Sequence, residues 1–188
     1  IVTSVLSLIA LVLILKIKVD LKEKRFHWIF LVVIALALFL RIQPNLYLTG
    51  GQDQGTYVSM SKQYEINHGL YIKDYFRESM PEKIKELYDK NNTFLGIEIK
   101  DLNNSEYVMP FYPAFPSWMS VFGSVFGSGN RVYALTLFSL LSIIGVYLLT
   151  YEISGRDRKV ALLASLFMAI SPMHVYFSKV ALTEIVSL

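Results

Sequence analysis

The chain has 188 residues, of which 54% are apolar and 18% charged, with a net charge of only +3. Soluble domains are typically about 45–50% apolar with roughly a quarter of their residues charged, so this composition excludes a disordered chain and argues against an ordinary soluble domain. Basic residues are scattered and cysteine is absent, which argues against a nucleic-acid partner and excludes disulfides, thiolate metal sites and a cysteine nucleophile.

Four apolar stretches are predicted to span a membrane, because a spanning helix needs about 20 mostly apolar residues. In chain order they are residues 1–17, 28–40, 132–151 and 160–170. The fourth is predicted to stop before Pro172, since proline disfavours helix in the preceding residue. The predicted fold class is therefore an α-helical polytopic membrane protein.

The short connections between the predicted spans are basic. Residues 16–25 contain five Lys and Arg against two acids, and residues 156–159 contain three against one. The positive-inside rule puts both connections in the cytoplasm. The long segment 41–130 then lies on the outer face, of the plasma membrane if the source is prokaryotic. Three parts follow: residues 1–40 with two spans, the outer segment 41–130, and residues 131–188 with two spans and the start of a further helix.

The outer segment is predicted to contain several α and β elements. Residues 56–67 carry apolar side chains at helical spacing, which indicates a juxtamembrane helix lying on the membrane or a helix packed on protein. Residues 81–90 begin with proline and continue with closely spaced opposite charges, which favours another helix. Residues 95–100 and 106–109 flank a polar turn and predict a small β-hairpin.

Two carboxylates are the leading candidates for chemistry. Asp53 lies between Gly51 and Gly55, and glycines let a ligand approach the backbone closely. Glu184 interrupts an apolar run, and an ionisable residue in such a run is a functional-site hypothesis. Simpler interpretations stay open: Asp53 could cap a helix beginning near Thr56, and Glu184 could pair with a nearby lysine or end a helix in solvent.

Several short motifs occur in order along the chain. They are L-F-L-R-I at 38–42, D-Q-G-T-Y-V at 53–58, P-F-Y-P-A-F-P at 110–116, V-F-G at 125–127, and S-P, Y-F-S-K and A-L-T-E within 171–184. Together they resemble the N-terminal part of the GT-C class of membrane glycosyltransferases, specifically the protein O-mannosyltransferase and aminoarabinose-transferase-like group. The sequence departs from that group at Gln54, where a second acid is common, and at Lys179, where arginine is common.

The resemblance implies an inverting enzyme that moves a sugar from a polyprenyl-phosphate donor to a hydroxyl of a protein, lipid or glycan at the outer face of the bilayer. Asp53 would act as the base, and Glu184 would orient the acceptor or the sugar. Lys179 would offset the phosphate charge, while Tyr57 and Tyr112 would line the sugar site. If a divalent cation such as Mg²⁺ or Mn²⁺ takes part, Asp53 and Glu184 are its expected ligands.

Other functions stay open on the sequence. One is a non-catalytic membrane protein whose outer segment binds a partner, and another is a transporter fragment with Glu184 in an ion path. The start at Ile1 and the apolar run reaching Leu188 predict a piece of a longer protein that would be inactive alone.

Overall fold

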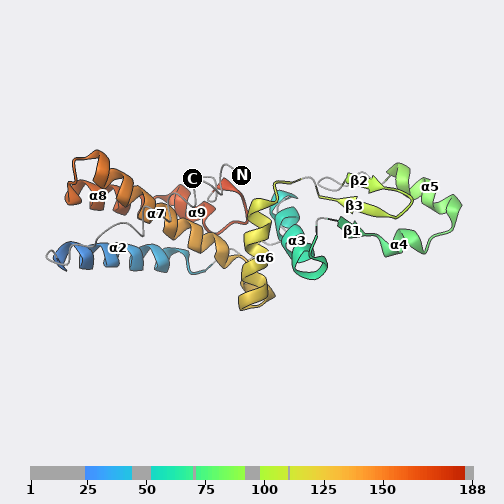
Figure 1. Cartoon of the computed structure of the whole chain (residues 1–188), viewed down its shortest axis with the longest axis horizontal. Coiled ribbons are helices and arrows are strands. Elements are labelled where there is room, and N and C mark those ends of the chain that lie inside the picture. Colours follow the sequence, from blue (N-terminus) through green and yellow to red (C-terminus); the bar gives the residue numbers. More distant parts are fainter. Residues whose placement is uncertain (1–23, 44–51, 70, 92–97, 110, 185–188) are drawn as a thin grey trace. The chain divides into compact units, whose positions relative to one another are not determined.

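The computed structural model describes residues 24–43, 52–69, 71–91, 98–109 and 111–184. These residues form mostly helices, together with one small sheet (Figure 1). Several sequence predictions fall outside the described residues. They are the first span at 1–17, the glycine Gly51 before Asp53, the first part of the predicted hairpin at 95–97, and Pro110 of the proline motif.

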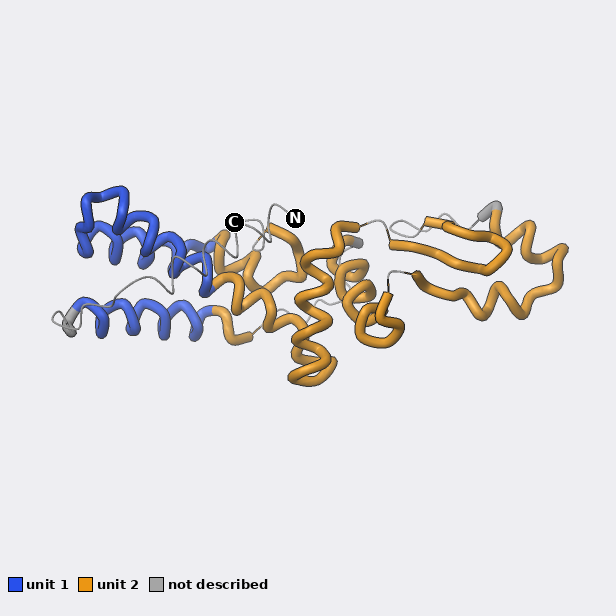
Figure 2. The backbone as a smooth tube through the Cα atoms, viewed as in Figure 1, with its two compact units in different colours: residues 1–40, 140–172 blue, residues 41–139, 173–188 orange. Residues whose placement is uncertain are grey.

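The chain forms two compact units, each made of two separate stretches (Figure 2). Unit 1 comprises Ile1–Leu40 and Leu140–Pro172, and unit 2 comprises Arg41–Ser139 and Met173–Leu188. The boundary after Leu40 coincides with the end of the first predicted part. Unit 2 combines the predicted outer segment with residues 131–139, because side chains there are buried against those of the outer segment.

Unit 1 is built from helices that match predicted apolar stretches. They are α2 (Lys24–Arg41), the larger part of α7 (Tyr133–Ile153) and α8 (Arg158–Ile170). Their shared core contains Val33, Ala37, Ile143 and Ala169, all buried. The two alanines let helix backbones approach closely, since a methyl side chain fills little space between them.

The turn before α8 is shaped by local chemistry. Gly155 and Arg156 both have positive φ, 69° and 71°, which reverses the chain after α7. Asp157 then caps α8, accepting hydrogen bonds from the backbone N–H groups of Lys159 and Val160 at 2.8 and 3.4 Å. The helix ends at Ile170, as the proline signal predicted, and Pro172 begins a new short helix, α9 (Pro172–Phe177).

Among the described helices, one is long and apolar enough to cross a membrane: the helical stretch Ser128–Ile153, which contains α7. The apolar part of α2, Phe26–Arg41, is shorter. Helix α8 has 13 residues, which extend about 20 Å against a hydrocarbon core of about 30 Å. The described residues therefore confirm a mostly helical protein with a small sheet. They contain one helix that could span a membrane, and they do not support the four predicted spans.

In unit 2, helix α3 (Gln52–Asn67) packs against α6 (Ala114–Phe126). The predicted helix over 56–67 is confirmed, but it begins four residues earlier. Tyr57 and Met60 of α3 are buried, which favours the interpretation of this helix as packed on protein. Asp53 lies in the first turn of α3 and therefore does not cap a helix beginning near Thr56.

The sheet has three antiparallel strands in the order β1-β3-β2: β1 (Tyr71–Lys73), β3 (Glu106–Val108) and β2 (Glu98–Asp101). The β2–β3 hairpin confirms the prediction in its described residues. Strand β1 was not predicted, because three residues are too few to show an alternating pattern. Tyr107 lies in the central strand opposite Ile72 and Ile99 and is buried.

Arg77 connects the sheet to two helices, α4 (Tyr75–Glu78) and α5 (Glu82–Asn91). Its guanidinium donates two hydrogen bonds to the Asp89 carboxylate, at 2.7 and 2.8 Å. It also donates to the Leu102 carbonyl at 2.5 Å and to the Ser105 hydroxyl at 2.8 Å, both in the hairpin turn. This bidentate geometry suits arginine and not lysine, and it explains how a charged side chain only 6% exposed is tolerated.

A second buried arginine, just before α7, forms hydrogen bonds with α3. Arg131 donates to the Glu65 carboxylate at 2.8 Å and to the Ser61 hydroxyl at 2.9 Å, and Ser128 donates to the other Glu65 oxygen at 2.8 Å. We call Ser61, Glu65, Ser128 and Arg131 the Arg131 clasp. Gly123 of α6 lies against it, because a Cβ at this position would come within 2.7 Å of Glu65 Oε2.

We predict that Gly123→Ala lowers the free energy of unfolding by roughly 2 kcal/mol. The added methyl displaces a carboxylate whose charged hydrogen bonds are worth about 1.5–3 kcal/mol each, and this loss exceeds the roughly 1 kcal/mol that alanine gains in helix propensity. Thermal unfolding of the purified full-length protein measures the change. Gly129→Ala is the matched control, since a Cβ there meets nothing within 4 Å; equal midpoints for both variants would contradict the prediction.

Candidate functional site

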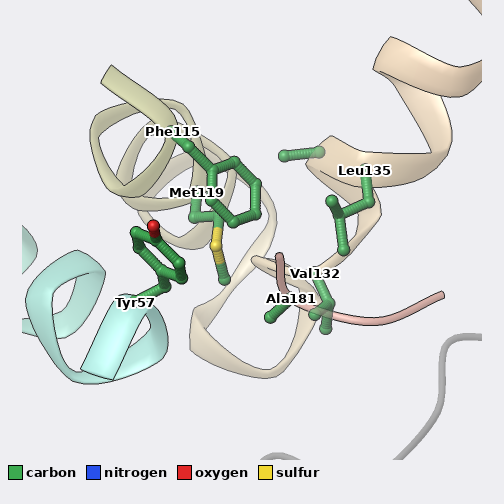
Figure 3. Close-up of a cluster of buried hydrophobic side chains, with 7 residues drawn as sticks. Tyr57, Phe115, Met119, Val132, Leu135 and Ala181 are labelled. Atoms are coloured by element: carbon green, nitrogen blue, oxygen red, sulfur yellow. The ribbon is translucent and has the colours of Figure 1, made fainter. Parts of the chain in front are cut away.

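The Tyr57 side chain is the centre of the candidate site. Its ring is 6% exposed and makes edge-on contacts with Phe111 and Phe115, with centroid separations of 5.2 and 5.6 Å. Figure 3 shows the ring of Tyr57 on α3 facing Phe115 and Met119 on α6. The apolar body of the tyrosine therefore belongs to the core of unit 2, while its hydroxyl meets polar groups.

The Tyr57 hydroxyl brings together residues from three distant parts of the chain. It is hydrogen-bonded to Thr183, and Asp53, Tyr112 and Glu184 are close enough to act on its ionisation. Asp53 stands one helical turn before Tyr57 on α3, so both side chains lie on the same helix face. Three of the other four predicted site residues, Asp53, Tyr112 and Glu184, thus lie near Tyr57.

The surroundings of Tyr57 keep its phenol protonated. Burial raises the pKa of Tyr57 above its ordinary value of 10.0, because the charged phenolate is disfavoured away from water. The hydrogen bond with Thr183 acts in the opposite direction, while the nearby Asp53, Glu184 and Tyr112 raise the pKa further. Tyr57 is consequently a neutral hydrogen-bonding group beside two acidic side chains.

Burial of the residues just before Glu184 positions the acid at this site. Val180 and Ala181 are each only 3% exposed, and Ala181 packs beside Val132 in the same core as Tyr57 (Figure 3). Anchoring these two residues carries Thr183 to the Tyr57 hydroxyl. Glu184 follows immediately and is itself exposed, so it can face a ligand while its backbone is held by the core.

The predicted phosphate-binding role of Lys179 and the predicted metal site have less support from the geometry around Tyr57. Lys179 is partly buried in the turn after α9, where its backbone N–H donates to the Tyr176 carbonyl at 3.0 Å, and it is not among the groups that perturb Tyr57. Asp53 and Glu184 supply two hard oxygen donors suited to Mg²⁺ or Mn²⁺. Within the described part of the chain, no group of three or more His, Asp or Glu side chains could hold a metal ion.

A second polar cluster in unit 2 was not predicted. Arg41, fully buried at the end of α2, donates from Nε to the Ser139 hydroxyl at 2.5 Å, and its terminal nitrogen lies 2.7 Å from His174 Nδ1. We call Arg41, Ser139 and His174 the Arg41 cluster. The cluster thus joins the end of the apolar stretch 28–40 to a residue 133 positions later in the chain.

The Arg41 cluster fixes the protonation of His174. The guanidinium has no acceptor, so Nδ1 must accept the hydrogen bond and the proton of the neutral ring sits on Nε2. Burial, and to a lesser extent the positive charge of Arg41, lower the pKa of His174 from 6.5 to about 4. The imidazole is therefore a neutral acceptor that ties α9 to Arg41.

Sequence reasoning missed Thr183 and the whole Arg41 cluster. Thr183 stands next to Glu184, and threonine in such a position carries no signal of its own. The three histidines of the chain have no metal-like spacing, so nothing in the sequence singles out His174. A buried hydrogen bond between residues so distant in sequence leaves no periodic pattern, although an arginine closing an apolar helix is a weak signal in itself.

No protein-family model, no curated protein and no solved structure matches this chain.

We predict that the protein loses stability as the pH falls from about 6.5 to about 4, through titration of His174. In that window the unfolded chain binds a proton that the folded protein does not, so the free energy of unfolding falls with pH and the loss is complete below the folded pKa. At about 1.36 kcal/mol per pKa unit, the shift corresponds to roughly 3 kcal/mol. Unfolding midpoints between pH 4 and 7.5 measure it.

His174→Gln is the informative variant, because an amide oxygen can accept from Arg41 without titrating. It should flatten the pH dependence in this window. His68→Asn is the control, since His68 is exposed with a positive φ of 53° that asparagine tolerates; it should retain the wild-type slope. A slope that survives in His174→Gln would exclude His174 as the titrating group.

Proposed function

We propose that this chain is the N-terminal membrane part of a GT-C-like glycosyltransferase, which transfers a sugar from a polyprenyl-phosphate donor to an acceptor hydroxyl at the outer membrane face. One observation carries the proposal. Asp53 and Glu184, predicted from sequence and far apart along the chain, both act on the ionisation of the Tyr57 hydroxyl. Two carboxylates beside a neutral phenol and an exposed tyrosine, Tyr112, suit the binding of a sugar and an acceptor hydroxyl.

The chemistry required is a single displacement with inversion. The Asp53 carboxylate removes the proton of the acceptor hydroxyl as its oxygen forms a bond to the anomeric carbon. The bond from that carbon to the phosphate oxygen breaks at the same time, and the polyprenyl phosphate leaves with the electron pair. General-base assistance of this kind is worth about 10²–10⁴-fold. No step of this proposal depends on a metal ion.

Other side chains would position the reactants. The Tyr57 hydroxyl, bonded to Thr183 and carried by a buried ring, lies near both acids and can hold a sugar oxygen. Glu184 is exposed beside it and can accept a hydrogen bond from the acceptor or the sugar. Lys179, in the turn after α9, would contribute positive charge toward the donor phosphate. Exposed carboxylates on a rigid, buried anchor are the arrangement that such a positioning role requires.

We predict that Asp53→Asn lowers glycosyl transfer by about 10²–10⁴-fold without unfolding the protein. The full-length protein in lipid is assayed with polyprenyl-phosphate sugars, and its unfolding midpoint is measured in parallel. Glu184→Gln should reduce turnover less severely, because an amide still orients a hydroxyl. Turnover at the wild-type level in Asp53→Asn would refute Asp53 as the base.

Two matched controls separate catalysis from a general effect of charge. Asp101→Asn alters an acid in the hairpin turn, and Glu86→Gln alters an exposed acid of α5. Both lie outside the Tyr57 environment, so both should retain wild-type transfer. A comparable loss of transfer in these controls would mean that the Asp53 effect is not local.

A separate prediction concerns the sides of the membrane. Single cysteines replacing Asn103, in the hairpin turn, and Lys159, at the start of α8, are both placed at exposed positions. The proposed topology puts them on opposite faces, so a membrane-impermeant maleimide added to sealed cells should modify the Asn103 variant and spare the Lys159 variant until the membrane is opened. Labelling of both before opening would contradict the topology.

A further inference from the structure

Helix α6 has an unusual composition for a helix outside the predicted spans. Its residues, Ala114–Phe126, include no charged side chain, and the chain carries none anywhere from residue 107 to 130. Polar coverage on the solvent side is the rule for a surface helix of a soluble protein. The composition of α6 therefore raises the question of what its outer face contacts.

One face of α6 is accounted for by the core of unit 2. Phe115, Met119 and Gly123 are buried, the first two against Tyr57 (Figure 3) and the third against the Arg131 clasp. Their spacing of four residues is that of a single helix face.

The opposite face of α6 is apolar and exposed. Trp118, Val121 and Val125 are exposed by 48, 50 and 66%. Their spacing again defines one side of the helix. The two serines that share it are small and uncharged, and the hydroxyl of Ser117 donates back to the Pro113 carbonyl at 2.7 Å. We call the three apolar residues the outer face of α6.

Chain continuity relates this outer face to the spanning candidate. Helix α6 ends at Phe126, Gly127 turns with φ of 93°, and the candidate span begins at Ser128. The Trp118 ring also contacts the Phe138 ring, with centroids 5.6 Å apart. Phe138 lies in the second turn of α7, so the outer face of α6 is level with the first turns of the candidate span.

We propose that α6 lies in the lipid–water interface, with its outer face against the acyl chains. The inference rests on the membrane location in the proposed function. A helix of 13 residues extends about 20 Å and is too short to span, but an apolar face beside the end of a span suits the interface. Trp118 would occupy the zone where tryptophan is enriched. The lack of charge favours lipid over a protein partner held by ion pairs, and it makes binding independent of anionic headgroups.

The proposal is tested by the depth of single nitroxide labels in the full-length protein, reconstituted in phosphatidylcholine vesicles. The 188 residues contain no cysteine, so Val121→Cys and Val125→Cys provide two independent positions on the outer face. Leu149→Cys, 63% exposed on α7, reports the span itself, and Leu87→Cys, 62% exposed on α5, is the matched apolar control remote from it. Relaxation by oxygen, which enriches in lipid, is compared with relaxation by a water-soluble nickel chelate.

We expect the Val121 and Val125 labels to be relaxed severalfold more by oxygen and severalfold less by nickel than the Leu87 label. Lipid signals from Leu149 with aqueous signals from Val121 and Val125 would overturn the inference and leave the proposed function standing. Shielding of both valine labels from both reagents would also overturn it, indicating coverage by protein. An aqueous Leu149 label would overturn the inference together with the membrane location.

Discussion

The burial of the Tyr57 ring is the constraint on which the rest of unit 2 depends. Packing between Phe111 and Phe115 fixes α3 against α6, and it leaves the hydroxyl at the edge of the core, where Thr183 reaches it. Because the ring cannot move without opening the core, Asp53 one turn earlier is fixed as well. A core tyrosine with a polar tip thus connects hydrophobic packing to the placement of two acids.

Three buried arginines also hold distant segments of unit 2 together. Arg41, Arg77 and Arg131 are each at most 6% exposed, and each joins segments far apart in sequence through charge-assisted hydrogen bonds. Arg77 and Arg131 form ion pairs with Asp89 and Glu65, and Arg41 bonds to a hydroxyl and a neutral imidazole. Desolvating a guanidinium is costly, so these contacts specify a single arrangement more than they add stability.

The predictions that succeeded depended on local patterns. The helices over 28–40, 132–151 and 160–170 and the β2–β3 hairpin follow from apolar runs, a proline stop and alternation about a polar turn, all of which act within a few residues. The predicted start of α3 is four residues too late, because glycine at residue 55 disfavours a helix by its own propensity. Strand β1 and the Arg41 cluster escaped because each depends on a distant partner, which single-sequence periodicity cannot reveal.

By itself, the sequence determined that this chain is rich in apolar helices, that its charges concentrate between them, and that Asp53 and Glu184 merit attention. Burial and short-range backbone preferences suffice for those conclusions. Only the tertiary structure decided that Asp53, Tyr112, Thr183 and Glu184 gather at Tyr57, and that α6 presents an uncharged outer face level with the start of α7. The grouping around Tyr57 and the exposure of the outer face depend on which surfaces of α3, α6 and the segment after α9 are buried against each other. Long-range packing determines those surfaces, and local sequence patterns do not.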